Sequence, residues 1–422
     1  MISLKKLRAN PEQYEQKFKN KDDISDIKSI IEIDRRVREL KHKSNLIRSE
    51  RNIATEQIGE SKKRREDATS AIKKARELGE ELKVIELDLS AIESDLKHKL
   101  LRFPNLPHSS VPEGENEHSN KIVREWGEKP QFNFKPKNHI ELGKKNQLFN
   151  FQTASKISGS GFSLYLGRGA MLERYLINSM LDHHIENFQF LEFFPPVLMS
   201  KKSMLTTGQL PKFKDDMYYC GNDDLYLAPT AEVPITNIHR NDILDEENLP
   251  IKYVAYSPCF RREAGSYGKE TRGLLRLHQF NKVELVKFVA PEYSYDELEL
   301  LTSQAESILQ ILGLNYRVVE LCRGDLSFAA SKCYDLEIWA PGEEKWLEVS
   351  SCSNFESFQA RRGNIRYRRS DDQKIDFVHT LNGSGLATPR LIVSLIETYQ
   401  TESGLIKFPK KVSEFLGVGE VF

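Results

Sequence analysis

Residues 259–285 read CFRREAGSYGKETRGLLRLHQFNKVEL, and this stretch decides the fold of the larger part of the chain. Apolar and β-branched residues at its two ends are typical of strands, and the glycine-rich polar stretch between them is typical of a loop. The side chains of Arg261, Arg272 and Arg276 are planar, permanently charged forks that suit phosphate oxygens, and Phe280 beside them can stack on a base. The alternative is an ordinary hairpin with surface ion pairs. The number of charged residues argues against it, since the stretch contains four arginines (with Arg262), Glu263 and Glu284.

Two further strings carry residues suited to ligand binding. HTLNGSGLATPR at 379–390 places Ser384 between glycines, which allow close backbone approach, and ends in Arg390. EVSS at 348–351 begins with Glu348, a carboxylate of the kind that magnesium prefers. Read alone, the first string is also compatible with a tight turn, and the second with a strand-end acid bonded to the backbone.

The pattern after residue 115 predicts an α+β domain built on an antiparallel sheet flanked by helices. Short β-branched and aromatic runs at 252–256, 282–289, 316–319 and 334–339 alternate with helical patterns outside a regular βαβ repeat. Neither GxxxxGK[ST] nor a GxGxxG after a strand occurs, and HExxH and GxSxG are also absent. Any ATP site would therefore rest on arginines and an acid-held magnesium ion.

The first hundred residues predict an antiparallel helical hairpin with a coiled-coil seam. They contain one proline and two glycines, and seam residues recur in steps of 3 and 4 from Ile30 to Ile58 and from Ala71 to Leu96. A polar stretch at 59–67 divides the two helices. Three prolines between 104 and 112 then predict a stiff linker. We therefore expect a hairpin domain at 1–102, a linker at 103–114 and a second domain at 115–422.

The far end of this hairpin is basic, because residues 61–75 contain six cations and only two acidic residues. These cations are Lys62, Lys63, Arg64, Arg65, Lys73 and Lys74. A solvated turn is one interpretation, since short charge runs are usually solvated. A tip that contacts nucleic-acid phosphates is the other, and the residue types leave the two even.

The bulk composition limits the remaining classes. The 62 basic residues balance the 62 acidic ones, so nucleic-acid binding through a whole-chain basic field is excluded. Five scattered cysteines form no CxxC pair and no zinc spacing, so we expect reduced thiols and no zinc. Because neither a signal sequence nor a run of 18 apolar residues is present, we expect a cytoplasmic protein without membrane association.

Taken together, these strings resemble the class II aminoacyl-tRNA synthetases, and in particular the seryl-tRNA synthetase family of bacterial type. FRxE followed by a polar loop and RxHQFxKVE resembles motif 2 of that class, and GLATPR resembles motif 3. The longer strings TGQLPKFKDDMY at 207–218, LAPTAEVP at 227–234, EVSSCSNFESFQARR at 348–362 and HTLNGSG at 379–385 are similar to the seryl branch. NFQFLEFFPPVLMS at 187–200 resembles motif 1, which in this class helps to build a dimer interface.

The resemblance implies a role for each matching position. The L-serine pocket would comprise Thr230, Ala231, Glu232, Glu284 and Ser384. The ATP site would comprise Arg261, Arg262, Glu263, Phe280, Glu348, Val349, Ser350, Ser351 and Arg390. Arg261, Glu348 and Arg390 would be the catalytic residues, and Glu348 and Ser351 would hold the Mg²⁺ that accompanies ATP.

The implied activity is the ATP-dependent activation of serine to seryl adenylate, followed by transfer to tRNA(Ser), with tRNA(Sec) left open. The resemblance implies a homodimer, and it favours the phosphate-contacting interpretation of Lys62–Lys74. Two rivals are an amino acid:carrier-protein ligase, which lacks the hairpin, and a non-catalytic RNA-binding relative, which the retained Arg261, Glu284, Glu348 and Arg390 argue against. Departures from the family pattern, at Gly161, Met171, Arg262 and Tyr267, concern contacts to the tRNA acceptor end.

Overall fold

The computed structural model describes residues 1–18, 21, 27–264 and 272–422, and in it the chain forms two compact units. One unit contains Ile2–Phe18 and residues 27–103. The other contains residues 104–422 with Met1 and Lys21. The units thus divide between Phe103 and Pro104, while Asn105 and Val111 of the expected linker are buried. The separate linker at 103–114 stays a prediction.

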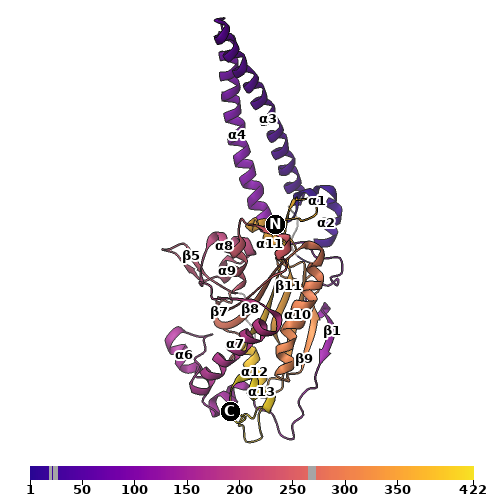
Figure 1. Cartoon of the computed structure of the whole chain (residues 1–422). Coiled ribbons are helices and arrows are strands. Elements are labelled where there is room, and N and C mark those ends of the chain that lie inside the picture. The colour runs from indigo at the N-terminus through magenta and orange to yellow at the C-terminus, as the bar shows by residue number, and fades with distance from the viewer. Residues whose placement is uncertain (19–20, 22–26, 265–271) are drawn as a thin grey trace. The chain divides into compact units, whose positions relative to one another are not determined.

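The first unit contains the expected hairpin, in which α3 (Ile27–Arg64) and α4 (Thr69–Arg102) lie side by side (Figure 1). With 38 residues at ~1.5 Å each, α3 is about 57 Å long. The seam residues Ile30, Val37 and Ile47 are buried. Ion pairs such as Arg48–Glu86, at 2.7 Å, flank the seam and favour one register. Two short helices, α1 (Leu4–Ala9) and α2 (Pro11–Phe18), complete the unit.

The turn of the hairpin is shorter than the sequence predicts. The polar stretch at 59–67 was expected to separate the helices, whereas α3 continues through Gly59 to Arg64. A single glycine within a helix costs only about 1 kcal/mol, and the glutamate, lysine and arginine residues that follow it are good helix formers. Arg65, in the left-handed region with φ +59°, ends the helix.

An eight-stranded sheet forms the centre of the second unit. Its strands, in spatial order, are β1 (Lys121–Trp126), β9 (Tyr316–Glu320), β10 (Lys332–Ala340), β11 (Lys345–Asn354), β14 (His379–Ala387), β8 (Gln279–Val289), β7 (Ile251–Phe260) and β2 (Leu191–Phe193). All neighbours are antiparallel except the edge pair β2 and β7, which is parallel. The antiparallel sheet and its four predicted strands are therefore confirmed.

Two three-stranded sheets lie beside the large one. They are β3 (Leu198–Ser200), β5 (Leu225–Leu227) and β4 (Tyr219–Cys220), and β13 (Ile375–Phe377), β12 (Arg366–Arg368) and β6 (Ile243–Asp245). The helices are α5 (His139–Lys145), α6 (Phe151–Ser158), α7 (Gly167–Phe188), α8 (Lys201–Thr207), α9 (Glu232–Thr236), α10 (Ser294–Ile311), α11 (Phe358–Gly363), α12 (Thr388–Thr398) and α13 (Lys410–Leu416). None of the described helices combines the length and the apolar composition needed to cross a membrane.

Helices α7, α10 and α12 cover one face of the large sheet (Figure 1). Their apolar side chains share one core with Val283 and Leu285 of β8. Because side chains alternate along a strand, Glu284 between these two residues points to the opposite face. That face carries the polar residues of the candidate site.

Candidate active site

A cavity of about 740 Å³ opens on the polar face of the large sheet. Residues of β8, β11 and β14 form its floor, and the segments 207–217, 229–232, 274–277 and 327–329 form its walls. The predicted site residues that line it are Thr230, Glu232, Arg261, Glu263, Phe280, Glu284, Glu348, Val349, Ser351, Ser384 and Arg390. Fold and cavity thus bring together side chains that lie up to 160 positions apart (230 to 390) in the sequence.

One end of the cavity is centred on Glu284, a buried carboxylate opposite Ser384 in the register of β8 and β14. Its Oε2 accepts a hydrogen bond from the hydroxyl of Thr230 at 3.0 Å and pairs with the Lys282 ammonium. Its Oε1 accepts a hydrogen bond from the Asn382 amide at 3.0 Å. Three donors therefore fix the carboxylate rigidly at the cavity floor.

A second carboxylate, Glu232, lies at the same end of the cavity, at the start of α9. The side-chain amide of Gln359 donates to its Oε1 at 2.5 Å, and the hydroxyl of Thr380 donates to the Gln359 oxygen at 2.7 Å. Burial, together with the negative charge of Glu284, raises the pKa of Glu232 to about 7. A cationic group that entered between the two acids would relieve this repulsion.

The middle of the cavity holds Arg261 and Phe280. The Arg261 guanidinium carbon lies 5.1 Å from the centre of the Phe280 ring, a cation–π distance. Glu263, with φ +52°, is paired with Arg276, whose Nε lies 2.5 Å from Glu263 Oε2. A flat apolar ring therefore lies beside cationic groups, which suits a base that carries phosphates.

The other end is formed by Glu348 and Arg390. The Arg390 guanidinium donates to the backbone oxygens of Glu348 at 2.9 Å and of Leu275 at 3.1 Å, and it lies 3.6 Å from Glu348 Oε2. Behind them, Ser351 faces Asp335 across β10 and β11. Burial and the charge of Glu348 raise the pKa of Asp335 well above its ordinary value.

Three predicted site residues do not line the cavity among the described residues. Ala231 is fully buried, and Ser350 is buried with its hydroxyl donating to the backbone oxygen of Ser384 at 2.7 Å. The side chains of both residues therefore do not contact the cavity directly. Arg262 is exposed, and its backbone N–H donates to the Asp216 carbonyl at 2.9 Å.

Sequence reasoning missed Lys282, Asn382 and Gln359, although all three lie within the strings that it used. Lys282 and Asn382 stand two positions before Glu284 and Ser384 on the same strands. Because every second residue of a strand points to the same face, this spacing was a usable signal for both. Gln359 lies on α11, far from Glu232 in the sequence, and spacing could not indicate their pairing.

The basic residues at 62–65, 73 and 74 are exposed at the far end of the hairpin. The first three belong to the last turn of α3, whereas Lys73 and Lys74 are on α4. Lys73 Nζ lies 4.0 Å from Glu77 Oε1, one turn further along α4. Exposure leaves this group of cations accessible to an anionic partner.

Of the departures from the family pattern, Gly161 has a structural reason. It adopts φ +79°, and a Cβ at this position would collide with the His278 ring. Met171 is partly buried against the core under α7. Tyr267 lies outside the described residues.

Comparison with known proteins agrees with this geometry. The family model of the tRNA synthetase class II core domain (G, H, P, S and T) matches residues 213–399, and that of the seryl-tRNA synthetase N-terminal domain matches residues 1–107. A serine--tRNA ligase of Chloroherpeton thalassium is 50% identical over 99% of both chains, and one of Bacillus subtilis is 49% identical over 100% of this chain and 99% of its own. The crystal structure of seryl-tRNA synthetase from Pyrococcus horikoshii complexed with ATP is 36% identical, with a TM-score of 0.92 over 100% of this chain and 99% of that one.

The sheet, its cavity and the core-domain match define a class II aminoacyl-tRNA synthetase. Because the hairpin also matches the N-terminal model and the relatives are similar over their whole length, the chain belongs to the seryl-tRNA synthetase family.

Proposed function

We propose that this chain is a serine–tRNA ligase, which activates L-serine with ATP and transfers the seryl group to tRNA(Ser). The observation that carries the proposal is the convergence of Arg261, Glu284, Glu348, Ser384 and Arg390 on one cavity in a chain of this family. Whether tRNA(Sec) is also a substrate is left to the charging assay below.

Serine is proposed to bind at the Glu232–Glu284 end of the cavity. Its ammonium group would lie against these two carboxylates, which repel each other when both are ionised. Its hydroxyl would be read near Ser384 and Thr230. A pocket that offers hydrogen bonds to a hydroxyl rejects alanine strongly, because buried polar groups would be left unpaired. Threonine must be refused by size, which is a weaker discriminator.

ATP is proposed to occupy the rest of the cavity. Adenine would stack on Phe280, the Arg261 guanidinium would bind the α-phosphate, and Arg390 would bind the distal phosphates. A serine carboxylate oxygen then attacks the α-phosphorus, and the bond to pyrophosphate breaks. A ribose hydroxyl of tRNA next attacks the seryl carbonyl, and AMP leaves. Positioning and cationic charge supply the catalysis, so no side-chain nucleophile is required.

A divalent metal ion accompanies the nucleotide in this proposal, and we assign Mg²⁺ to Glu348 and Ser351. The donors fit, because the Glu348 carboxylate and the Ser351 hydroxyl line the cavity, and a cation there would offset the repulsion from Glu348 that helps to raise the pKa of Asp335. Hard cations bind such oxygen donors together with phosphate oxygens. When bound, the ion would neutralise phosphate charge.

The remaining assignments concern partners and location. We propose that residues 62–65, 73 and 74 contact the tRNA backbone, supported by their exposure and charge. We propose a homodimer that uses the motif 1 region, supported by Leu191 at 58% and Phe194 at 83% exposure. Five free cysteines support a cytoplasmic location.

Serine-dependent exchange of pyrophosphate into ATP, measured with each amino acid in turn, tests the activity. We expect exchange with serine and much weaker exchange with alanine and threonine. Exchange with a different amino acid and none with serine would overturn the proposal. Charging of tRNA(Ser) and tRNA(Sec) transcripts in parallel then defines the tRNA specificity.

A further inference from the structure

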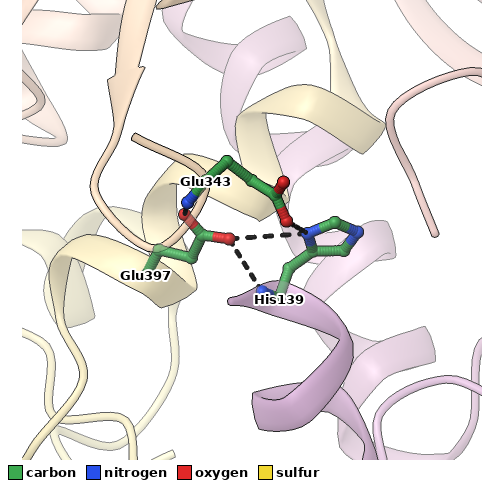
Figure 2. A group of neighbouring side chains, drawn as sticks. All are labelled: His139, Glu343 and Glu397. Atoms are coloured by element: carbon green, nitrogen blue, oxygen red, sulfur yellow. Dashed lines mark hydrogen bonds and ion pairs between the residues drawn. The ribbon is translucent and has the colours of Figure 1, made fainter. Parts of the chain in front are cut away.

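His139, Glu343 and Glu397 form a fully buried polar cluster outside the residues that line the cavity (Figure 2). His139 begins α5, Glu343 lies in the turn between β10 and β11, and Glu397 lies near the end of α12. His139 Nδ1 lies 3.1 Å from Glu343 Oε1 and 3.4 Å from Glu397 Oε1. The Glu397 carboxylate also accepts hydrogen bonds from the backbone N–H of His139, at 2.7 Å, and from that of Gly342, at 2.8 Å.

The hydrogen bonds of the cluster define the tautomer of His139. The backbone N–H of Leu274 donates to His139 Nε2 at 3.1 Å, so Nε2 carries a lone pair rather than a proton. The ring proton is therefore on Nδ1, which lies within 3.4 Å of both carboxylates but is not aligned for a hydrogen bond to either. The ring thus links two acids to the backbone of residue 274.

The same three residues have donor atoms within 4.8 Å of one another, as a metal site requires. A metal ion could bind Nδ1 only if this nitrogen carried no proton. The other ring nitrogen, Nε2, already accepts a hydrogen bond from the Leu274 N–H and therefore carries no proton either. Both ring nitrogens would then lack protons, which a neutral imidazole does not allow. The geometry therefore favours a structural support, in which the ring is hydrogen-bonded through Nε2, over a metal centre.

The cluster supports the segment that forms one wall of the cavity. Arg272 donates to Glu343 Oε2 at 2.6 Å, and Leu274 donates to His139. The carbonyl oxygen of the next residue, Leu275, accepts a hydrogen bond from the guanidinium of Arg390. Leu275 and Arg390 both line the cavity. Arg390 and Glu397 are seven positions apart on α12, which places them on one face of that helix.

Between these anchors, Gly273 leaves no room for a side chain. It adopts φ +61°, and a Cβ there would collide with His139 Nε2. Residues with a side chain rarely adopt such a φ, so the conformation and the close contact together favour glycine here. The backbone of 272–275 is therefore held against the His139 ring with little freedom to shift.

We propose that His139 is a positioning residue for the nucleotide: with Glu343 and Glu397 it fixes the backbone of 272–275 and, through the Leu275 carbonyl, the guanidinium of Arg390. The inference rests on the proposed function in assigning Arg390 to the phosphates of ATP. It concerns ATP alone, because the serine end of the cavity is built from residues 230, 232, 284 and 384 on other segments.

The test compares His139→Phe, His139→Gln and a control, His183→Phe, in the full chain. Phenylalanine keeps the ring volume and removes both polar atoms, whereas glutamine keeps an oxygen that can accept the Leu274 N–H. His183, which is partly buried where His139 is fully buried, is hydrogen-bonded to Ser307 at 2.8 Å and does not line the cavity. The readouts are the Kd of a non-hydrolysable ATP analogue, the KM for serine in pyrophosphate exchange, and the melting temperature.

We expect His139→Phe to raise the Kd of the analogue about tenfold, since it leaves a buried N–H unpaired beside the phosphate-binding wall. The KM for serine should be unchanged, His139→Gln should retain most of the affinity, and His183→Phe should bind the analogue as the unchanged chain does. A folded His139→Phe with unchanged analogue affinity would overturn the inference. An equal loss for ATP and serine would overturn it as well, because it would indicate a general structural defect.

A second pair of variants keeps the inference testable should His139→Phe not fold. Gly273→Ala forces the wall away from His139 and should weaken analogue binding. Adding His139→Ala should weaken it little further, because both changes break the same contact. Additive losses would contradict the inference. If the unchanged chain gave no exchange with serine, the proposed function would fail, while analogue binding by these variants would still decide the positioning role.

Discussion

Replacing Glu232 with glutamine is expected to stabilise the protein at alkaline pH and to weaken its binding of serine. Burial and the charge of Glu284 raise the pKa of Glu232 from an ordinary 4.5 to about 7 in the folded chain. Between these two values the folded state binds more protons than the unfolded state, so the free energy of unfolding falls as the pH rises. Glutamine is uncharged at every pH and does not carry this penalty.

The magnitude follows from the difference between the two pKa values. A difference of about 2.5 pKa units, at 1.36 kcal/mol each, gives roughly 3 kcal/mol once Glu232 is fully ionised, above about pH 8. The gain should vanish below about pH 4.5, where both states are protonated. Glutamine keeps an oxygen that can accept the Gln359 amide, so little hydrogen bonding is lost.

The assay is chemical denaturation of Glu232→Gln and of the unchanged chain at pH 5, 6, 7 and 8. Glu402→Gln, at an exposed position, serves as the control and should show no pH-dependent difference. In exchange assays the KM for serine should rise about tenfold, while the KM for ATP stays constant. A stability difference that is equal at pH 5 and pH 8, or a destabilised variant at pH 8, would refute the reasoning.

Three other substitutions test the remaining parts of the site. Alanine at all four positions 62–65 should raise the KM for tRNA and flatten the salt dependence of that KM, while serine-dependent pyrophosphate exchange is unchanged. An equal loss in tRNA charging and in exchange would indicate that the hairpin tip has only a structural role. Arg261→Lys should lower the rate of exchange by about a hundredfold, because an ammonium lacks the fork of a guanidinium, and a rate within twofold would contradict its role at the α-phosphate. Phe280→Ala should raise the KM for ATP about tenfold through lost stacking, and an unchanged KM would remove adenine from this ring.

Much of the candidate site could be predicted from the sequence because strands and loops bring short strings to the cavity intact. Arg261, Glu284, Glu348, Ser384 and Arg390 all line one cavity, as the strings predict. Some residues of these strings point into the core instead of the cavity, and the sequence does not distinguish them from their neighbours. Ala231 and Ser350 are buried behind the wall instead of lining it.

Two features required the folded chain. The end of α3 lies at Arg64 because Arg65 enters the left-handed region with φ +59°, and the helix-forming residues around it give no local signal of that change. The protonation of Glu232 depends on burial and on Glu284, which is 52 positions away in the sequence. Long-range proximity of this kind has no signature in residue spacing.

The sequence by itself determined the hairpin, the antiparallel sheet, the family and eleven of the residues that line the cavity, because periodicity and contiguous motifs are local properties. Only the tertiary structure decided which buried groups face one another. The cluster of His139, Glu343 and Glu397 joins residues up to 258 positions apart, and the Leu274 N–H that defines its tautomer comes from a fourth segment. The strength of a buried polar contact depends on desolvation and on distance in space, and both arise only when the chain has folded.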